Sequence, residues 1–386
     1  MRPRTAVLIA ASAGMSVLVL DSSIVGTMIP TMSDELALSP RDQTWMVASY
    51  LLSLGIFLPC AGPTVDYLSP RRSFLCGCLG FAIASLGLST ASSATELIMW
   101  RAVAGLAAAV LMPASTALVA LTHPDQRTRA IAVVTGLGQT SAVIGPALGG
   151  VLAQCVTWRL GFGVGVPVGL AAMLIVAGTR AGAQASQPPA SAPVRAGSSR
   201  RRAVLPPFVV LAGLGLSMTI ATVYGASEVQ RALHLSPTSA GLSLLPLILA
   251  MLATTLVLTR SRFSPAPRRS GVAGASSMAM GLMIMSGGFA WGMLPLTIFG
   301  MVPVGCGIAL LMAPMTAYAL SLYPEGRQGR AAAWCSTGRQ LGGALGVFSF
   351  AVVSSSWGSS AGFLLAGAVM LASTAVAWRI PRGVQA

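Results

Sequence analysis

Ionisable side chains are rare in the long apolar segments of this sequence, and the few that occur there are the first candidates for chemistry. Asp21, Arg101 and Arg339 lie inside such segments, and Asp66 and Glu228 lie at the ends of two others. In a hydrocarbon environment an ionisable side chain costs about 2.5–3.5 kcal/mol on insertion scales. Each of these residues is therefore a candidate for binding a proton, an ion or a polar group.

Asp21 is the leading candidate because it is the only carboxylate deep inside an apolar segment. It is predicted to bind a proton or a substrate, and the alternative is a structural partner for an arginine of a neighbouring helix. Arg101 is predicted to pair with a carboxylate or to line a cavity, and the alternative is that it extends its guanidinium to the membrane surface. Arg339 and the following Gln340 lie deeper in their predicted helix. They are candidates for a substrate or proton site, and the alternative for Arg339 is that it binds backbone carbonyls between packed helices.

The elements that must position these residues are transmembrane helices. Of the 386 residues, 54% are hydrophobic and only 9% are charged, and the mean hydropathy is +0.78. Apolar runs long enough to cross a bilayer recur along the whole chain, and short alternating barrel strands are absent. We therefore predict an all-α membrane protein whose first segment is a retained helix rather than a cleaved signal. About twelve spans are predicted: 6–29, 44–66, 73–93, 97–121, 129–154, 160–178, 204–226, 238–259, 271–290, 293–321, 330–353 and 359–379.

The basic residues predict the orientation of the chain. All 24 are arginines, and with the N-terminus inside, only Arg41, Arg159 and Arg231 fall in outer loops. This asymmetry predicts that both termini are cytoplasmic. It also explains the net charge of +15 without nucleic acid as a partner. The tryptophans near the predicted outer ends are interpreted as interfacial anchors: Trp45, Trp100, Trp158, Trp291 and Trp357.

Several classes of chemistry are excluded by residue types. A chain without lysine has neither a P-loop for a nucleotide nor a Schiff-base lysine. His123 and His234 fall on opposite sides of the predicted membrane, and the cysteines lack metal-binding spacing, so no metal site is expected. We expect a protein that is not an enzyme and that uses no cofactor, with a proton gradient as its energy source.

Two related halves are predicted. Residues 180–203 are rich in Pro, Ser and Arg and are predicted to form a disordered cytoplasmic linker between six-helix bundles at 1–179 and 204–386. The loop Pro70-Arg71-Arg72-Ser73 is matched by Pro267-Arg268-Arg269-Ser270 about half a chain later. Such parallel repeats are a transporter architecture in which the substrate site lies near the membrane midplane.

Small residues recur in corresponding helices of both halves. Gly145, Pro146, Gly149 and Gly150 lie in the fifth predicted helix, and Gly342 to Gly346 lie in the eleventh. Glycines allow close helix contact, and a proline can bend a helix. These positions predict tight packing and are candidates for a gating interface.

These motifs together resemble the major facilitator superfamily, and specifically its drug–proton antiporter branch, which usually has fourteen helices. The resemblance covers nearly the whole chain. Asp21 falls in the first-helix motif, Tyr50 at the start of the second helix, and Arg101 to Gly105 in the fourth-helix motif implicated in proton coupling. Gly62 to Asp66 with Arg71 and Arg72 resembles the loop that gates the cytoplasmic side. Gly145 to Gly150 resembles the antiporter motif, the most specific sign of export.

The resemblance implies a bacterial, monomeric inner-membrane antiporter that exports a small amphipathic organic compound, such as an antibiotic, in exchange for protons. The gating loop departs from the family pattern, because Ser69 replaces a glycine and Pro70 replaces a basic residue. Two alternatives stay open: a symporter for metabolite uptake, and a transport-inactive membrane sensor or scaffold.

Overall fold

The computed structural model describes residues 3–179, 198–232, 234–260, 266–323 and 328–380. Within these residues the protein is helical and contains no strand. The chain divides into two compact units, Met1–Ala190 and Ser191–Ala386, here called the first and second halves. The division falls within the segment predicted as a linker, of which residues 180–197 lie outside the described residues.

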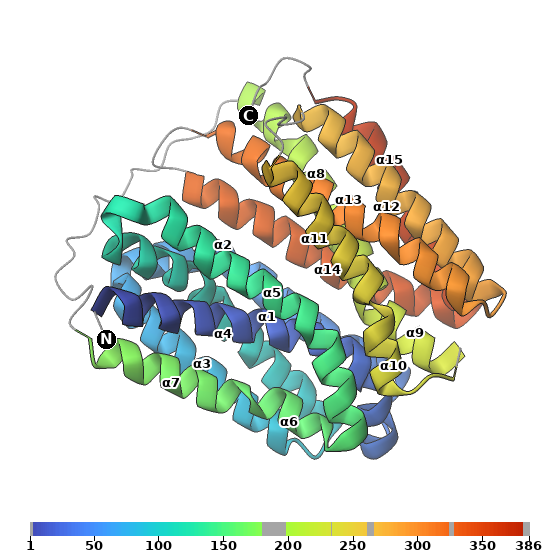
Figure 1. The fold of residues 1–386 in the computed structure, drawn as a ribbon, viewed down its shortest axis with the longest axis horizontal. Helices are drawn as coiled ribbons and strands as arrows, with labels where there is room; N and C mark the ends of the chain where they lie inside the picture. Colours follow the sequence, from blue (N-terminus) through green and yellow to red (C-terminus); the bar gives the residue numbers. More distant parts are fainter. Residues whose placement is uncertain (1–2, 180–197, 233, 261–265, 324–327, 381–386) are drawn as a thin grey trace. The chain divides into compact units, whose positions relative to one another are not determined.

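The described residues of the first half form six long helical segments, the last made of two consecutive helices; Figure 1 labels these helices. A 3₁₀ turn, Pro124–Gln126, precedes the fifth. The helices are α1 (Pro3–Leu36), α2 (Pro40–Leu68), α3 (Pro70–Thr90), α4 (Ala94–Thr122), α5 (Arg127–Cys155), α6 (Trp158–Gly163) and α7 (Gly165–Ala177).

The second half has the same plan with more interruptions. A π-helical turn, Ile220–Tyr224, joins its first two helices. The helices are α8 (Ser198–Thr219), α9 (Gly225–Ala232), α10 (Pro237–Ser243), α11 (Leu245–Arg260), α12 (Pro267–Ala290), α13 (Leu294–Ser321), α14 (Gln328–Trp357) and α15 (Ser359–Ala377). The helix α8 begins six residues before the predicted start at 204.

Helix starts follow local sequence signals. Proline lies in the first turn, where its missing N–H is not needed, of helices α2, α3, α10, α12 and α13. Before α2, Ser39 and Asp42 form a capping box, in which each side chain accepts a hydrogen bond from the other residue's backbone N–H. These caps fix the short turns between neighbouring helices.

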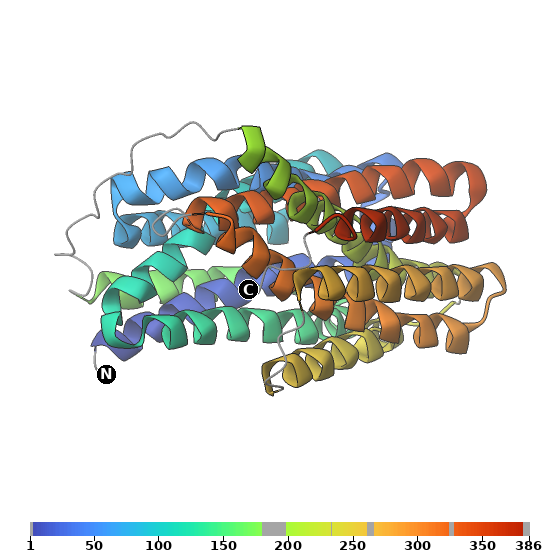
Figure 2. The same ribbon diagram turned by 90° about the horizontal axis from the view of Figure 1, so that it is seen from above.

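The two halves use the same helix pairings. In the first half α1 packs on α5, α2 on α4, and α3 on both α4 and α7; in the second half α8 packs on α14, α11 on α13, and α12 on both α13 and α15. Figure 2 shows the helices of each half running alongside one another. This correspondence fits the repeat that the matching loops predict.

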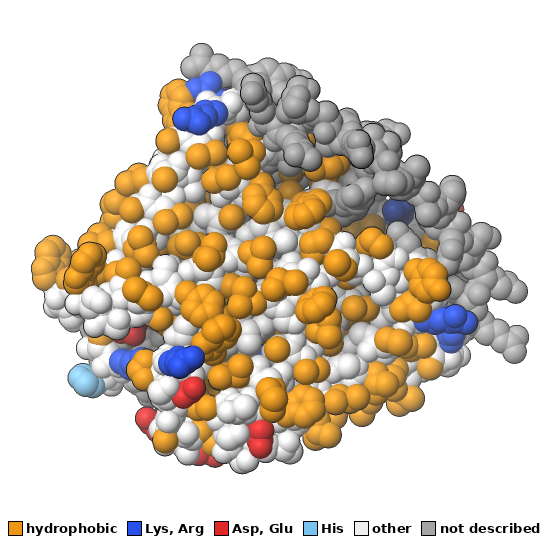
Figure 3. Space-filling model, turned by 180° about the vertical axis from the view of Figure 1, so that it is seen from behind, with side chains coloured by type: hydrophobic (Ala, Val, Ile, Leu, Met, Phe, Trp, Pro, Cys, Tyr) orange, Lys and Arg blue, Asp and Glu red, His pale blue; other side chains and the backbone are white. Residues whose placement is uncertain are grey.

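The surface and helix lengths suit a lipid environment. Ten helical segments of the described residues are long and apolar enough to cross a membrane, and eleven if the bent α5 is one span. Helix α14 is not among them, so its span stays a prediction. Large apolar side chains such as Leu174, Val257 and Phe299 are each 64% exposed. On the face shown in Figure 3, hydrophobic side chains are spread widely and charged ones lie towards the margins. The chain is a multi-pass membrane protein.

Candidate functional site

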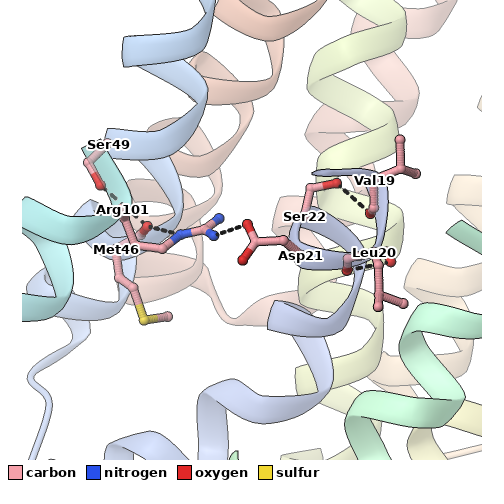
Figure 4. Close-up of polar contacts among 8 residues, drawn as sticks. Val19, Leu20, Asp21, Ser22, Met46, Ser49 and Arg101 are labelled. Carbon is pink, nitrogen blue, oxygen red and sulfur yellow. Dashed lines mark hydrogen bonds and ion pairs between the residues drawn. The ribbon is translucent and has the colours of Figure 1, made fainter. Parts of the chain in front are cut away.

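The two charged side chains deepest in the first half form an ion pair. Asp21 on α1 is 4% exposed and Arg101 on α4 is 2% exposed. Nη1 of Arg101 donates to Oδ2 of Asp21 at 2.7 Å, as Figure 4 shows. Removing one partner of a buried pair typically costs about 3–5 kcal/mol, because the other charge is left uncompensated. The pair is therefore a place where one proton can change the energy of the fold.

Arg101 is held by more than this carboxylate. Its Nε donates to the carbonyl oxygen of Met46 on α2 at 3.3 Å (Figure 4), and its guanidinium lies 4.4 Å from the ring centroid of Tyr50. The ring of Phe162 on α6 lies 5.9 Å away. Contacts from α1, α2 and α6 thus meet at one guanidinium. Of the roles that the sequence left open for Arg101, the structure shows pairing with a carboxylate, and the side chain is buried rather than exposed at the surface.

A glycine one turn along α4 explains how the helices come so close. A Cβ at Gly105 would lie 2.5 Å from the carbonyl oxygen of Tyr50 on α2. Any larger residue would push α4 away from α2 and withdraw Arg101 from Met46 and Tyr50. The spacing from Arg101 to Gly105 is one helical turn, so the charge and the close contact share one face of α4.

One oxygen of the pair is unused. Oδ1 of Asp21 is buried and has no hydrogen-bond partner among the described residues. An unsatisfied carboxylate oxygen in a dry interior is costly. A proton on Oδ1 would leave Oδ2 facing Arg101, so the carboxyl group can be protonated without first being turned around.

The loop residues predicted as a gate act differently from one another. Arg71 donates from Nη2 to the carbonyl oxygens of Val176, Ala177 and Thr179, at 3.3, 2.9 and 3.1 Å, and so caps the C-terminal end of α7. Arg72 is exposed, and a Cβ at Gly62 would meet no atom within 4 Å. The side chain of Asp66 lies outside the described residues.

Ser69, at the start of this loop, has a backbone conformation that favours glycine. Its φ is +78° and its ψ is 144°. Side chains rarely adopt this region, which costs of the order of 1–3 kcal/mol. The serine compensates in part, because its Oγ accepts a hydrogen bond from the backbone N–H of Arg72. The loop therefore keeps a turn that suits glycine although the glycine itself has been lost.

The glycine motif of α5 brings that helix against α1. A Cβ at Gly149 would lie 2.6 Å from Oγ1 of Thr27 and 2.9 Å from the carbonyl oxygen of Ile24, and one at Gly145 would overlap the Ser23 side chain. Pro146 and Gly150 are buried beside them. The helix axis turns by 41° between Arg129–Ala142 and Ile144–Cys155. Pro146 explains this bend, because it cannot donate to the carbonyl of residue 142.

The candidates of the second half lie on two helices, α9 and α14. Glu228 on α9 is 8% exposed, and its Oε2 accepts a hydrogen bond from Ser359 at the start of α15 at 2.6 Å. Arg339 is half-buried on α14, where its carbonyl oxygen would block a Cβ at Gly215 of α8, and Gln340 is 9% exposed. Among the described residues, no ion pair joins Glu228 to a cation.

A polar cluster at the C-terminal end of α1 was missed by the sequence reasoning. Glu35 accepts hydrogen bonds from the Trp158 indole and the Arg159 guanidinium, and Arg159 also donates to the carbonyl oxygen of Ala91 at 3.1 Å. The expectation that Trp158 is an interfacial anchor is wrong, because its ring is fully buried and bound to Glu35. A signal was present, since Glu35 and Arg159 are rare opposite charges on the same predicted side.

The π-helical turn was also missed. It carries Tyr224, whose ring stacks on Phe350 of α14 with centroids 4.0 Å apart and whose hydroxyl donates to the Val347 carbonyl oxygen at 3.4 Å. Such turns have no simple sequence signature and occur frequently at functional sites. Among the described residues, no group of three His, Cys, Asp or Glu side chains is arranged to hold a metal ion.

Known proteins share sequence and fold with this chain. A resistance and export protein for tetracenomycin C from Streptomyces glaucescens is 34% identical over 168 residues, which is 43% of this chain and 31% of that protein. The chain thus matches only about a third of the length of this curated relative.

Solved structures show the same fold. A D-xylose–proton symporter superimposes with a TM-score of 0.79 at 13% identity, covering 97% of each chain. A bacterial homologue of the lysosomal transporter Spinster, in an inward-facing state, gives 0.76 at 13% identity over 98% of this chain and 97% of that one. The model of the Major Facilitator Superfamily matches residues 11–347. With this match over most of its length, the chain belongs to the Major Facilitator Superfamily.

Proposed function

We propose that the protein exports a small amphipathic organic compound, such as an antibiotic, across a bacterial inner membrane in exchange for protons, by alternating access. The observation that carries the proposal is the buried pair of Asp21 and Arg101 with its unused carboxylate oxygen. The relative that is named for resistance and export supports the direction of transport. The glycine motif of α5, which resembles that of antiporters, supports it as well.

The pair suggests how a proton would act. With Asp21 ionised, the carboxylate and Arg101 neutralise each other in a buried site. Protonation of Asp21 removes the negative partner, while Arg101 keeps the Met46 carbonyl and the Tyr50 ring. The conformation that needs the intact pair is then disfavoured, and the other conformation is populated instead. Substrate binding would favour the first conformation again and release the proton.

The energy available is sufficient for such a cycle. One proton that enters down the membrane potential supplies about 2.3 kcal/mol per 100 mV. That is equivalent to roughly a fiftyfold concentration gradient of a neutral solute. Because Arg101 already neutralises the deep carboxylate, a neutral or anionic substrate suits the site better than a dication.

The test is accumulation of a panel of antibiotics in energised cells of an efflux-deficient bacterium that express this chain. We expect lower accumulation of at least one compound, restored by a protonophore and by Asp21→Asn. Asp34→Asn is the matched control, because Asp34 is an exposed carboxylate on the same helix. Increased accumulation would indicate uptake, and unchanged accumulation of every compound with the protein present in the membrane would favour a sensor or scaffold.

A further inference from the structure

The two matching arginine loops have different partners, although their sequences agree. In the first half, Arg71 is engaged by three carbonyl oxygens at the end of α7. In the second half, the corresponding Arg268 lies instead over the indole ring of Trp378, 4.3 Å from its centroid. The cation–π contact orients the guanidinium but uses none of its N–H donors in a conventional hydrogen bond.

A single residue difference accounts for this. The last turn of α7 ends in Val176-Ala177-Gly178, and the last turn of α15 ends in Val376-Ala377-Trp378. At Gly178 no side chain covers the terminal carbonyl groups, so Arg71 reaches them. At the equivalent place in the second half, Arg268 contacts the indole ring of Trp378 instead of the terminal carbonyl groups.

A close helix contact holds this arrangement in place. A Cβ at Gly271 would lie 3.1 Å from the Cβ of Ala377, so the first turn of α12 and the last turn of α15 approach closely. Arg268 lies one turn before Gly271, and Trp378 directly follows Ala377. The position of the guanidinium over the indole is therefore set by two packed helices.

Among the described residues, no acidic side chain pairs with the arginines at this end of the second half. Arg269 and Arg379, the neighbours of Arg268 and Trp378 in sequence, are both exposed. Within the part of the chain that the structure describes, the side chains of Arg268, Arg269 and Arg379 make no hydrogen bond or ion pair. The one described acid of this half, Glu228, contacts the opposite end of α15, about 28 Å away for a 19-residue helix.

We propose that Arg268, Arg269 and Arg379 bind the phosphate of an anionic phospholipid headgroup beside Trp378. A guanidinium offers paired donors that match phosphate oxygens, and tryptophan is enriched where a protein meets the headgroup region. The chain spans a membrane, and Trp378 is 54% exposed. A bilayer lipid is thus the anion that reaches this site with its acyl chains along α12 and α15.

The test is lipid binding to the purified full chain, measured by native mass spectrometry. Phosphatidylglycerol and phosphatidylcholine with identical acyl chains are titrated against the wild type and the variants Arg268→Ala, Arg269→Ala and Trp378→Ala. Arg41→Ala is the matched control, because it removes one exposed arginine from the first half. A thermal unfolding transition confirms that each variant is folded. Arg269→Ala alters only an exposed side chain, so it still tests the proposal if another variant does not fold.

We expect the wild type to prefer phosphatidylglycerol. Arg268→Ala should weaken that binding by about fivefold, the share of one arginine near an anionic surface. Arg269→Ala and Trp378→Ala should also weaken it, whereas Arg41→Ala should leave it unchanged. Equal weakening by Arg41→Ala, or no preference between the lipids, would overturn the proposal. So would displacement of phosphatidylglycerol by an equal concentration of inorganic phosphate, because the site would then take the free anion.

Discussion

At the residue scale, Asp21 and Arg101 combine features of a structural ion pair and of a proton site. The contacts of Arg101 with the Met46 carbonyl and the rings of Tyr50 and Phe162 hold the guanidinium in place beside the Asp21 carboxylate. Oδ1 of Asp21, which has no hydrogen-bond partner among the described residues, can accept a proton. A pair that served only to join α1 and α4 would be expected to satisfy both oxygens.

Removing Arg101 should reveal how strongly the pair is coupled. Arg101→Ala leaves Asp21 buried without its partner, and we expect a loss of about 3–5 kcal/mol in unfolding free energy. The double variant Asp21→Asn/Arg101→Ala should lose less than Arg101→Ala alone, because no uncompensated carboxylate remains. Thermal unfolding of the purified protein in detergent measures both. If the two single effects simply add in the double variant, Asp21 and Arg101 are not coupled.

The sequence could identify these two residues one by one but not their contact. Asp21 and Arg101 were found because charged groups are costly in apolar segments. Their partnership depends on how α1, α2 and α4 pack, and 80 positions separate the two residues in the chain. Glu35 was missed for the opposite reason. It lies in the polar stretch Ser33-Asp34-Glu35, which was predicted to follow a helix ending at 29, whereas α1 continues to Leu36.

At the element scale, glycine contacts decide which helices come close. In the first half, Gly149 of α5 allows α1 to pack closely, because a Cβ there would lie 2.9 Å from the Ile24 carbonyl oxygen. In the second half, a Cβ at Gly346 of α14 would lie 2.6 Å from the Leu216 carbonyl oxygen of α8. The two contacts occupy corresponding helix pairs. The sequence predicted these tight contacts from residue size alone, but the partner helices could not be predicted, because small residues are compatible with any close neighbour.

Substitution within α5 should separate contact from helix propensity. Gly149→Ala places a methyl group against the Ile24 carbonyl and should destabilise the protein by about 1–3 kcal/mol, with reduced transport. Gly136→Ala is the control on the same helix, because a Cβ there meets nothing within 4 Å. It should be neutral or slightly stabilising, since alanine favours the helix. Equal unfolding midpoints for the two variants would contradict the importance of the α1–α5 contact.

At the scale of the whole molecule, the distribution of arginines predicts the orientation that the proposed function needs. Fusions to alkaline phosphatase, which is active only outside the cytoplasm, can test this orientation. We expect no activity for a fusion after His123 or at the C-terminus, and activity for a fusion after Gly358, between α14 and α15. Reporter activity of the fusion after His123 would contradict the predicted orientation. The pattern of arginines predicted this orientation, whereas the breaks at Ile220–Tyr224 and between α6 and α7 required the structure.

The most direct test of the central claim is proton movement coupled to substrate in proteoliposomes. A transported compound identified by the accumulation panel is applied as an imposed gradient, and a trapped pH-sensitive dye reports protons. We predict proton movement opposite to the compound for the wild type. Asp21→Asn should abolish that proton movement and still exchange labelled for unlabelled compound. Proton movement by Asp21→Asn at the wild-type rate would contradict the assignment of Asp21 as the coupling residue.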